Sequence, residues 1–109
     1  KPFKIFGDGF QIRDFIHVKD IASANIAAMN SKIKSGFFNI GTGKPTTINE
    51  LANTMIEISG HKKGINHAES LEGDIKISLA DITNAQKLFH WNYSINLKNG
   101  LEKLIEDYL

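Results

Sequence analysis

The stretch Gly7–Phe15, with the sequence GDGFQIRDF, combines two glycines, two acids and an arginine just ahead of an apolar run. An arginine keeps its charge at physiological pH, and its planar guanidinium matches phosphate and carboxylate groups with parallel N–H donors. Neighbouring side chains of an extended segment point to opposite sides, so Asp14 need not neutralise Arg13. Two hypotheses therefore remain open: a turn with a structural arginine, or a loop that presents one cation to an anionic ligand.

A second glycine-rich stretch, Gly41–Pro45 (GTGKP), follows an apolar run and precedes a predicted helix. Phosphate-binding loops occupy such positions, but their spacing is a glycine, four residues, and then Gly-Lys-Ser/Thr. Here proline follows Lys44, and the position that would need the first glycine is Phe38. The dinucleotide pattern G-x-G-x-x-G also fails, because residue 46 is threonine. We therefore interpret the stretch as a tight turn between two elements.

Other chemistries find little support in the residue pattern. The four histidines His17, His61, His67 and His90 have no metal-ligand spacing, so no metal site is predicted. No nucleophile-elbow motif occurs, and no pair of acids suits glycoside hydrolysis. His17 lies within an apolar run and is interpreted as a packed histidine.

Composition sets further bounds on the function. The chain has 109 residues, of which 41% are hydrophobic and 23% charged, and its net charge is +1. No strong basic stripe is present, so a nucleic-acid partner is not expected. No apolar run is long enough to cross a membrane, and the absence of cysteine fits a cytoplasmic location. Because Lys1 already begins what reads as a strand, we expect a piece of a longer protein.

The apolar spacing predicts a mixed α/β fold. The expected strands are 3–6 and 15–18, as a hairpin or a pair of edge strands, then a buried strand at 37–40 and another at 65–68. The expected helices are 21–30 with Asp20 as cap, 48–59 between Thr47 and Gly60, 82–89 with Asp81 as cap, and one from 97 onward with Asn96 as cap.

Further details accompany these elements. A turn is expected at 72–74. In the third helix region Leu88, Phe89 and Trp91 are expected to face inward. The last helix is expected to gather Leu97, Leu101, Leu104, Ile105 and Tyr108 on one face.

Three segments in this order resemble a known family: residues 4–22, 38–52 and 72–91. They are similar to the C-terminal part of the extended short-chain dehydrogenases, the NAD-dependent nucleotide-sugar epimerases and dehydratases, with the UDP-glucose 4-epimerases nearest in pattern. The resemblance implies that residues 1–109 form the C-terminal substrate-binding lobe with the last Rossmann-type elements. It also implies an N-terminal Rossmann domain, outside this chain, that binds NAD.

The resemblance implies site residues and partners as well. Arg13 corresponds to the arginine that grips the substrate diphosphate, and Gln11 is its typical neighbour. Lys4 and Phe6 correspond to the strand that meets the nucleobase, and Asp74 to an aspartate that contacts the nucleotide. The implied substrate is a nucleotide sugar, UDP-linked, and the implied parent protein is a homodimer. Asp20 corresponds to a structural helix cap.

The sequence also departs from the family pattern. Leu71 stands where the family carries a second arginine for the diphosphate. The catalytic Tyr-x-x-x-Lys pair is missing, since Leu97 follows four residues after Tyr93. No catalytic or NAD-binding residue is therefore assigned here, and the chain alone is predicted to be inactive. In the family, NAD transiently oxidises a sugar carbon and returns the hydride to the other face.

Alternative functions remain open at this point. The parent protein could be a dehydratase or reductase of the same family, because groups near the cofactor set the reaction type. The chain could also be a stand-alone, non-catalytic binding module, or a purely structural fragment. The segments 37–40 and 48–59 are expected to need neighbours from outside the chain, so the isolated chain is expected to be weakly stable or oligomeric.

Overall fold

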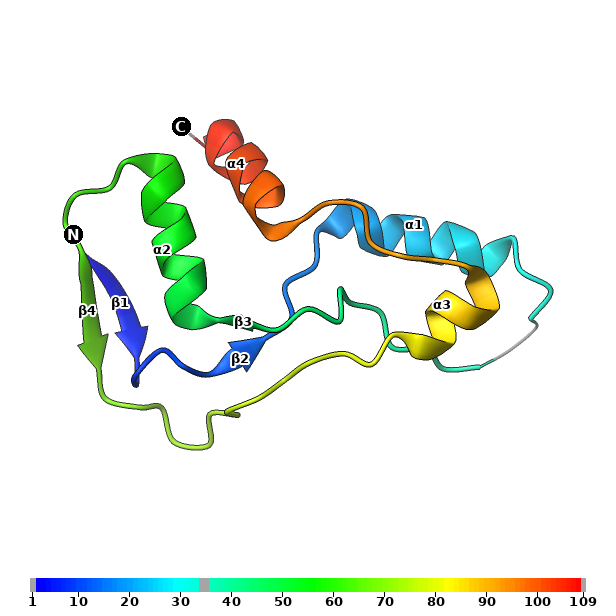
Figure 1. Ribbon diagram of the computed structural model, residues 1–109, viewed down its shortest axis with the longest axis horizontal. Coiled ribbons are helices and arrows are strands. Elements are labelled where there is room, and N and C mark those ends of the chain that lie inside the picture. The colour runs from blue at the N-terminus through cyan, green and yellow to red at the C-terminus, as the bar shows by residue number, and fades with distance from the viewer. Residues whose placement is uncertain (1, 34–35, 109) are drawn as a thin grey trace.

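The computed structural model describes residues 2–33 and 36–108, and within them the fold is mixed α/β as predicted. Figure 1 shows α1 and α3 at one end of the molecule and β1, β4, α2 and α4 at the other. The strands β2 and β3 and extended segments join the two ends. In chain order the elements are β1 (Phe3–Phe6), β2 (Ile12–Arg13), α1 (Val18–Met29), β3 (Thr46–Thr47), α2 (Ile48–Ser59), β4 (Ile65–Ala68), α3 (Thr83–Phe89) and α4 (Leu97–Tyr108).

The strand pairing is entirely non-local. β1 pairs in parallel with β4, and β2 pairs antiparallel with β3. A single parallel bridge also joins Ile12 to Ile77. The predicted hairpin between the first two strands is therefore wrong. The glycine loop at 7–9 leads the chain from one two-stranded sheet to the other instead of folding it back on itself.

Helix α2 forms as the local pattern predicts. The hydroxyl oxygen of Thr47 accepts a hydrogen bond of 3.1 Å from the backbone N–H of Glu50 and so satisfies one free donor of the first turn. Gly60 ends the helix in the left-handed conformation, at φ 69°.

Helix α1 begins earlier than predicted, and its cap is a different residue. It starts at Val18, and the Nδ1 of His17 accepts a hydrogen bond of 3.0 Å from the backbone N–H of Lys19. The predicted strand at 15–18 is therefore wrong. Asp20 does not cap the helix but lies within its first turn, only 2% exposed. Its carboxylate accepts hydrogen bonds from the segment before α4 instead.

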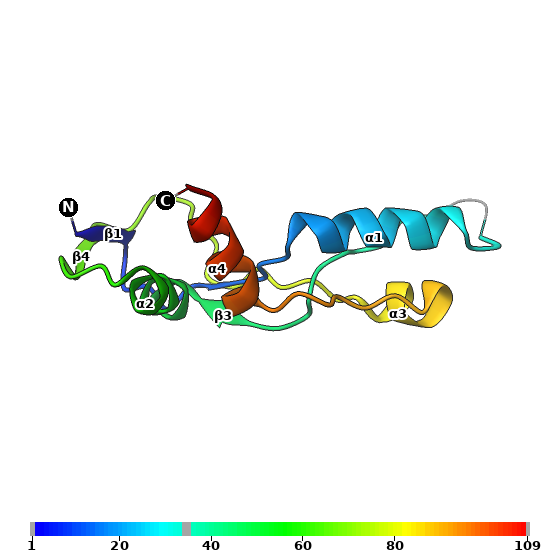
Figure 2. The same cartoon turned by 90° about the horizontal axis from the view of Figure 1, so that it is seen from above.

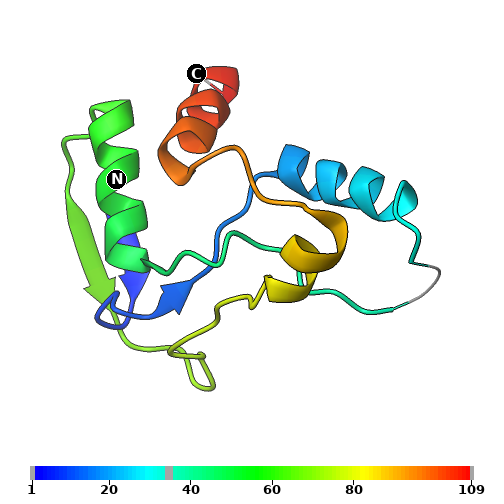
Figure 3. The ribbon, with the colours of Figure 1, turned by 45° about the vertical axis from the view of Figure 1, so that its right-hand side comes forward.

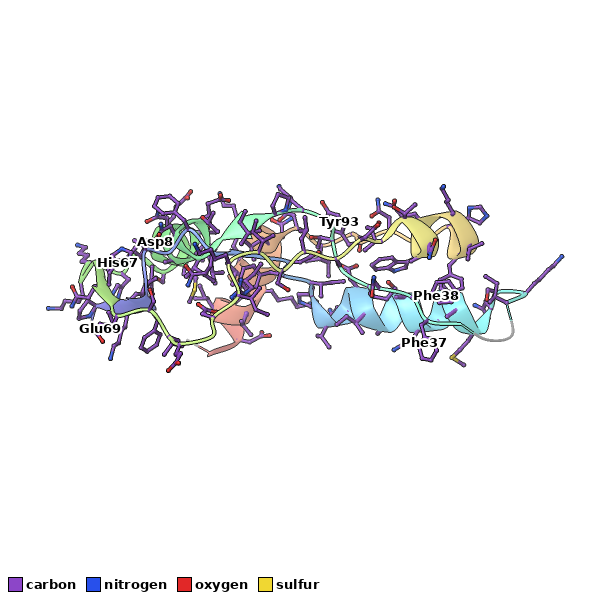
Figure 4. All side chains as sticks on the ribbon, turned by 90° about the horizontal axis from the view of Figure 1, so that it is seen from below. Asp8, Phe37, Phe38, His67, Glu69 and Tyr93 are labelled. Atoms are coloured by element: carbon purple, nitrogen blue, oxygen red, sulfur yellow. The ribbon has the colours of Figure 1, made fainter. Side chains whose placement is uncertain are left out.

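The predicted buried strand at 37–40 is also wrong. This segment forms no β-ladder in the described structure, and Phe37 is fully exposed. Phe38 packs against Phe89, with ring centroids 4.5 Å apart. Figure 4 shows Phe37 and Phe38 at the end that carries α1, far from Asp8 and His67. The apolar run thus serves packing against α3 rather than a sheet.

The last two helices agree more closely with the prediction. α3 begins at Thr83, one residue later than expected, and Asp81 accepts from its backbone N–H at 3.1 Å. Asn96 accepts from the N–H of Asn99 at 2.8 Å and so caps α4. Leu88 and Leu104 are about half exposed, so these two did not turn inward as expected. The predicted role of the Tyr108 side chain lies outside the described residues.

The predicted turn at 72–74 is present. The backbone N–H of Asp74 donates to the carbonyl of Leu71 at 3.2 Å, and Gly73 has a φ of 79°.

The molecule is flat and holds little core. Its extents are 51 × 33 × 16 Å, and its radius of gyration is 16.4 Å, against about 13 Å for a compact domain of this length. Figures 2 and 3 show the thin edge and the separation of the two ends. The main cluster of buried apolar residues lies between α1 and α3 and consists of Ala24, Ile82, Ala85 and Trp91.

Candidate functional site

Asp74 is the centre of a polar cluster built by residues far apart in the sequence. One carboxylate oxygen accepts from the Arg13 guanidinium at 2.7 Å, and the other accepts from the Gln11 side-chain amide at 3.4 Å. The same amide nitrogen of Gln11 also donates to the backbone carbonyl of Phe6 at 3.1 Å. Arg13 donates a second bond to the carbonyl of Ile12 at 2.8 Å, which fixes its orientation.

Two backbone features bring this cluster together. The turn at 72–74 redirects the chain just where Asp74 stands. The following residues then run beside β2: Ile12 donates to the carbonyl of Lys76 at 2.7 Å, and Ser78 donates to the carbonyl of Ile12 at 2.9 Å. Side chains two residues apart share a face of an extended segment, so Gln11 and Arg13 can both reach Asp74.

A hollow of about 380 Å³ lies next to the cluster, within the size range of small-molecule sites. Its lining residues are Phe6, Gly7, Asp8, Phe10, Gln11, Ile12, Ser70, Leu71, Asp74, Ile75, Lys76 and Ile77. A second hollow of about 360 Å³ includes Arg13, Asn39 and Ser78 in its lining. The Arg13–Asp74 ion pair therefore joins the linings of two neighbouring hollows, which together offer apolar walls and a few polar groups.

The structure brings four of the five predicted site residues into this cluster: Gln11, Arg13 and Asp74 by their side chains and Phe6 by its carbonyl. Lys4 is not among them. Its ammonium nitrogen lies 5.3 Å from the ring centroid of Phe6, and it lines a separate hollow with Asn66 and His67 at the β1–β4 end.

The glycine loop at 41–43 is held in place by the side chain of Asp14. The Asp14 carboxylate accepts from the backbone N–H groups of Thr42 and Gly43 at 2.9 Å each, from the hydroxyl of Thr42 at 2.7 Å, and from the N–H of Ala80 at 3.3 Å. Burial raises the pKa of Asp14, but these hydrogen bonds outweigh it and leave the pKa below its usual value.

These hydrogen bonds to Asp14 matter for NAD, the cofactor that the resemblance implies. A dinucleotide loop offers free backbone N–H groups to a pyrophosphate. In this chain the backbone N–H groups of Thr42 and Gly43 already bind Asp14, so these two donors are not free for a pyrophosphate.

Residues 76 and 78 are the site positions that the sequence reasoning missed. Lys76 lines the first hollow and Ser78 the second. Their two-residue spacing after Asp74 was visible in the sequence, but only the register between 76–78 and β2 places them beside Arg13. Within the described residues, no group of three or more potential metal ligands is gathered. None of the helices described here combines the length and apolar character that a membrane crossing requires.

Comparisons with known proteins bear on the family and the fold. Residues 1–41 match the NAD dependent epimerase/dehydratase family. The UDP-glucuronate 4-epimerase of Thermodesulfobacterium geofontis is 36% identical, over 96% of this chain and 32% of that protein. The crystal structure of UDP-glucose 4-epimerase from Thermotoga maritima with UDP-glucose gives a TM-score of 0.93 at 35% identity, over 99% of this chain and 35% of that one.

A further structure carries both a substrate and a cofactor. It is the UDP-glucuronic acid 4-epimerase from Bacillus cereus in complex with UDP-glucuronic acid and NAD, with a TM-score of 0.87 and 32% identity, over the whole of this chain and 36% of that one. The chain thus has the fold of one part of an extended short-chain dehydrogenase, and it spans about a third of the length of these proteins. The resemblance to the NAD-dependent nucleotide-sugar epimerases and dehydratases is confirmed.

Proposed function

We propose that residues 1–109 are the nucleotide-sugar-binding part, in C-terminal position, of an NAD-dependent nucleotide-sugar 4-epimerase. One observation carries this proposal: Arg13 and Gln11 converge on Asp74 at the edge of a hollow of about 380 Å³. Proteins similar to this chain over nearly its whole length are named as UDP-glucose and UDP-glucuronate 4-epimerases, which supports a UDP-linked substrate.

In this proposal Arg13 binds the substrate diphosphate. Its side chain is only 24% exposed and is held by Asp74 and by the carbonyl of Ile12, so little conformational freedom is lost on binding. Charge-assisted contacts from a fixed guanidinium to phosphate oxygens are strong and directional. Asp74 is 31% exposed and retains room to accept a hydrogen bond from the nucleotide. Phe6 and Lys4 would meet the nucleobase through the backbone of β1, since Lys4 lines a separate hollow.

The remaining parts of the proposal lie outside this chain. NAD and the groups that move the hydride and proton would belong to the rest of the longer protein, so residues 1–109 alone would have no activity. The whole protein would be a cytoplasmic homodimer. When bound, NAD would supply the reversible oxidation at the sugar, while the residues described here would hold the nucleotide and orient the sugar toward it.

Two other functions remain in competition. A dehydratase or reductase of the same family would use the same nucleotide contacts and a different set of groups around the cofactor. A stand-alone binding module would hold the nucleotide without any reaction. We favour a 4-epimerase because the similar proteins of known name act, by those names, on the sugar C4 centre.

The test uses the full-length protein that contains this chain, loaded with NAD. UDP-glucose and UDP-glucuronate are supplied separately, and the product sugars are identified by NMR. We expect interconversion of one substrate with its C4 epimer. Arg13→Ala is expected to raise KM by about tenfold or more, because a charge-assisted contact of about 1.5–3 kcal/mol is lost. Lys62→Ala, an exposed change beside β4, is the matched control and should leave KM unchanged.

The outcomes separate the competing functions. Release of water from the sugar, or a net reduction, would replace the epimerase by a dehydratase or reductase. Binding of UDP-sugars without turnover would favour the stand-alone module. Absence of binding, or an Arg13→Ala variant with unchanged KM, would contradict the proposed site.

A further inference from the structure

The charged residues that line the two hollows differ in whether an opposite charge already lies beside them. The lining contains the cations Arg13 and Lys76 and the acids Asp8, Asp14 and Asp74. Asp14 binds the glycine loop, and Asp8 accepts from the backbone N–H of Phe10 at 2.9 Å. Arg13 is paired with Asp74. In the described part of the chain no carboxylate lies within 4.0 Å of the Lys76 ammonium group, so Lys76 is the cation of the lining that has no ion pair.

The backbone register places Lys76 on the same face as Arg13. Ile12 exchanges its two hydrogen bonds with Lys76 and Ser78, so Ile12 and Ile77 are the bridge partners and share one face of this short parallel ladder. Side chains alternate along extended segments. Gln11 and Arg13 therefore share the opposite face with Lys76 and Ser78. This is also the face on which Asp74 binds Gln11 and Arg13.

The ligand of the proposed function needs more positive charge than Arg13 provides. A nucleoside diphosphate carries at least two negative charges, and here the charge of Arg13 is already matched by Asp74. A second cation on the same face, in the lining of the hollow that Asp74 also borders, would stabilise the diphosphate by charge-assisted hydrogen bonds. A lysine suits this role, because its ammonium group is a compact charge on a flexible stem.

We propose that Lys76 is the second cation that binds the diphosphate of the nucleotide, beside Arg13, and that it sets the preference for a diphosphate over a monophosphate. This inference rests on the proposed function. The side chain of Lys76 can be tested separately from its backbone, because only the backbone carbonyl of Lys76 takes part in the ladder. A side-chain substitution therefore leaves the β2 contact in place.

The experiment is a calorimetric titration of the full-length, NAD-loaded protein with UDP, UMP and uridine. The variants are Lys76→Gln, Lys76→Arg and Lys63→Gln, the last as a matched loss of one exposed lysine in the turn before β4. Lys76→Gln is expected to weaken UDP binding by about tenfold, as loss of one charge-assisted contact predicts, and to leave uridine binding within about twofold. The ratio of UDP to UMP affinity should fall as well.

The conservative variant and the control variant test whether the charge at residue 76 is what matters. Lys76→Arg keeps the charge and should retain most of the UDP affinity, while Lys63→Gln should bind as wild type does. Thermal unfolding of each variant checks that the fold is intact.

The results distinguish a failure of the proposed function from a failure of the role of Lys76. If wild type binds UDP, Arg13→Ala weakens it, and Lys76→Gln does not, the role of Lys76 is overturned and the proposed function stands. If Lys76→Gln weakens UDP and uridine equally, Lys76 does not read the diphosphate, and the inference is again wrong. If wild type fails to bind UDP at all, both the proposed function and the role of Lys76 fall.

Discussion

The guanidinium of Arg13 lies 2.7 Å from the carboxylate of Asp74, although 61 positions of sequence separate the two residues. The pair has two consequences. It holds the arginine in one orientation, and it means that an anionic ligand meets a cation whose charge is already shared. Asp74 is thus both an orienting residue for Arg13 and a competitor for it.

The strength of this pair can be measured by a double-mutant cycle with Arg13→Met and Asp74→Asn. Both side chains remain partly solvated, at 24% and 31% exposure, so solvent screening limits the coupling. We expect a coupling of about 0.5–1 kcal/mol in the free energy of unfolding. Urea unfolding of the full-length protein supplies the four values. Additive single effects would show that the pair contributes nothing to stability.

Asp20→Asn is expected to destabilise the protein by about 1–3 kcal/mol, the cost of leaving one buried donor without its acceptor. One carboxylate oxygen of Asp20 accepts from the N–H and hydroxyl of Ser94, and the other accepts from the N–H of Ile95 at 3.0 Å. An asparagine would turn an N–H₂ group toward one of these donors. Urea unfolding measures the change, and the exposed Glu106→Gln on α4 is the control that should stay near wild type.

Lowering the pH should reduce the free energy of unfolding through protonation of Asp14. Burial raises its pKa, but the hydrogen bonds from Thr42, Gly43 and Ala80 lower it below the ordinary value of 3.8. A folded-state pKa below the unfolded one gives stability that is complete well above pH 3.8 and is lost as the pH falls through the folded pKa. The Asp14→Asn variant should therefore lose less of its free energy of unfolding than wild type as the pH falls from about 5 to about 3. An unchanged acid slope in this variant would contradict the assignment.

Gly9→Ala should cost more than the ordinary penalty for a positive φ. Gly9 has a φ of 79°, and an added Cβ would collide with the side-chain amide of Asn49, which donates to the carbonyl of Asp8 at 3.0 Å. Gly64→Ala is the matched control, because its φ is 76° and no atom outside the neighbouring residues lies within 4 Å of the added Cβ.

We expect Gly64→Ala to cost about 1 kcal/mol and Gly9→Ala clearly more, from thermal unfolding of the full-length protein. The Gly9 variant should also weaken UDP binding, because this loop positions Gln11. Equal losses in the two variants would mean that the contact with Asn49 does not matter.

Residues 1–109 expressed alone are expected to associate or to unfold readily. Val18, Ile26 and Met29 of α1 are 58–82% exposed, and Phe37 is fully exposed nearby. Exposed apolar surface of this kind favours self-association. Sedimentation velocity over a concentration series measures it. A monomer with a sharp unfolding transition that does not depend on concentration would contradict the expectation.

The sequence predicted the elements whose signals are local. Helix α2 has its cap at Thr47, its apolar spacing and its terminal glycine within fourteen consecutive residues, so each signal supports the others. Strand pairing depends on residues far apart, and neither the β1–β4 pair nor the position of 76–78 beside β2 has a local signature. The apolar run at 37–40 resembled a strand only because short runs do not distinguish a strand from a packed extended segment.

The site shows the same division. Arg13, Gln11 and Asp74 were chosen by a family resemblance, and the structure brings them into contact. Asp20 was misread because an acid ahead of an apolar run is a common helix cap, while its actual partners lie 74 and 75 positions away. No sequence pattern marked Lys76, because its place beside the site depends on the register between residues 76–78 and β2.

For residues 1–109 on their own, the flatness has a consequence for hydrogen exchange. The structure is 16 Å deep along its shortest axis, against about 10–12 Å for one helix with its side chains, so little of the backbone can be shielded by packing alone. The slowest-exchanging amides outside the helices should then be those bound by carboxylates, at Thr42, Gly43, Ser94 and Ile95, rather than those in the two-residue strands. The carboxylates of Asp14 and Asp20 each bind backbone N–H groups of a segment that lies far away in the sequence. These contacts cross-link the chain non-covalently, as disulfides do covalently in small secreted proteins.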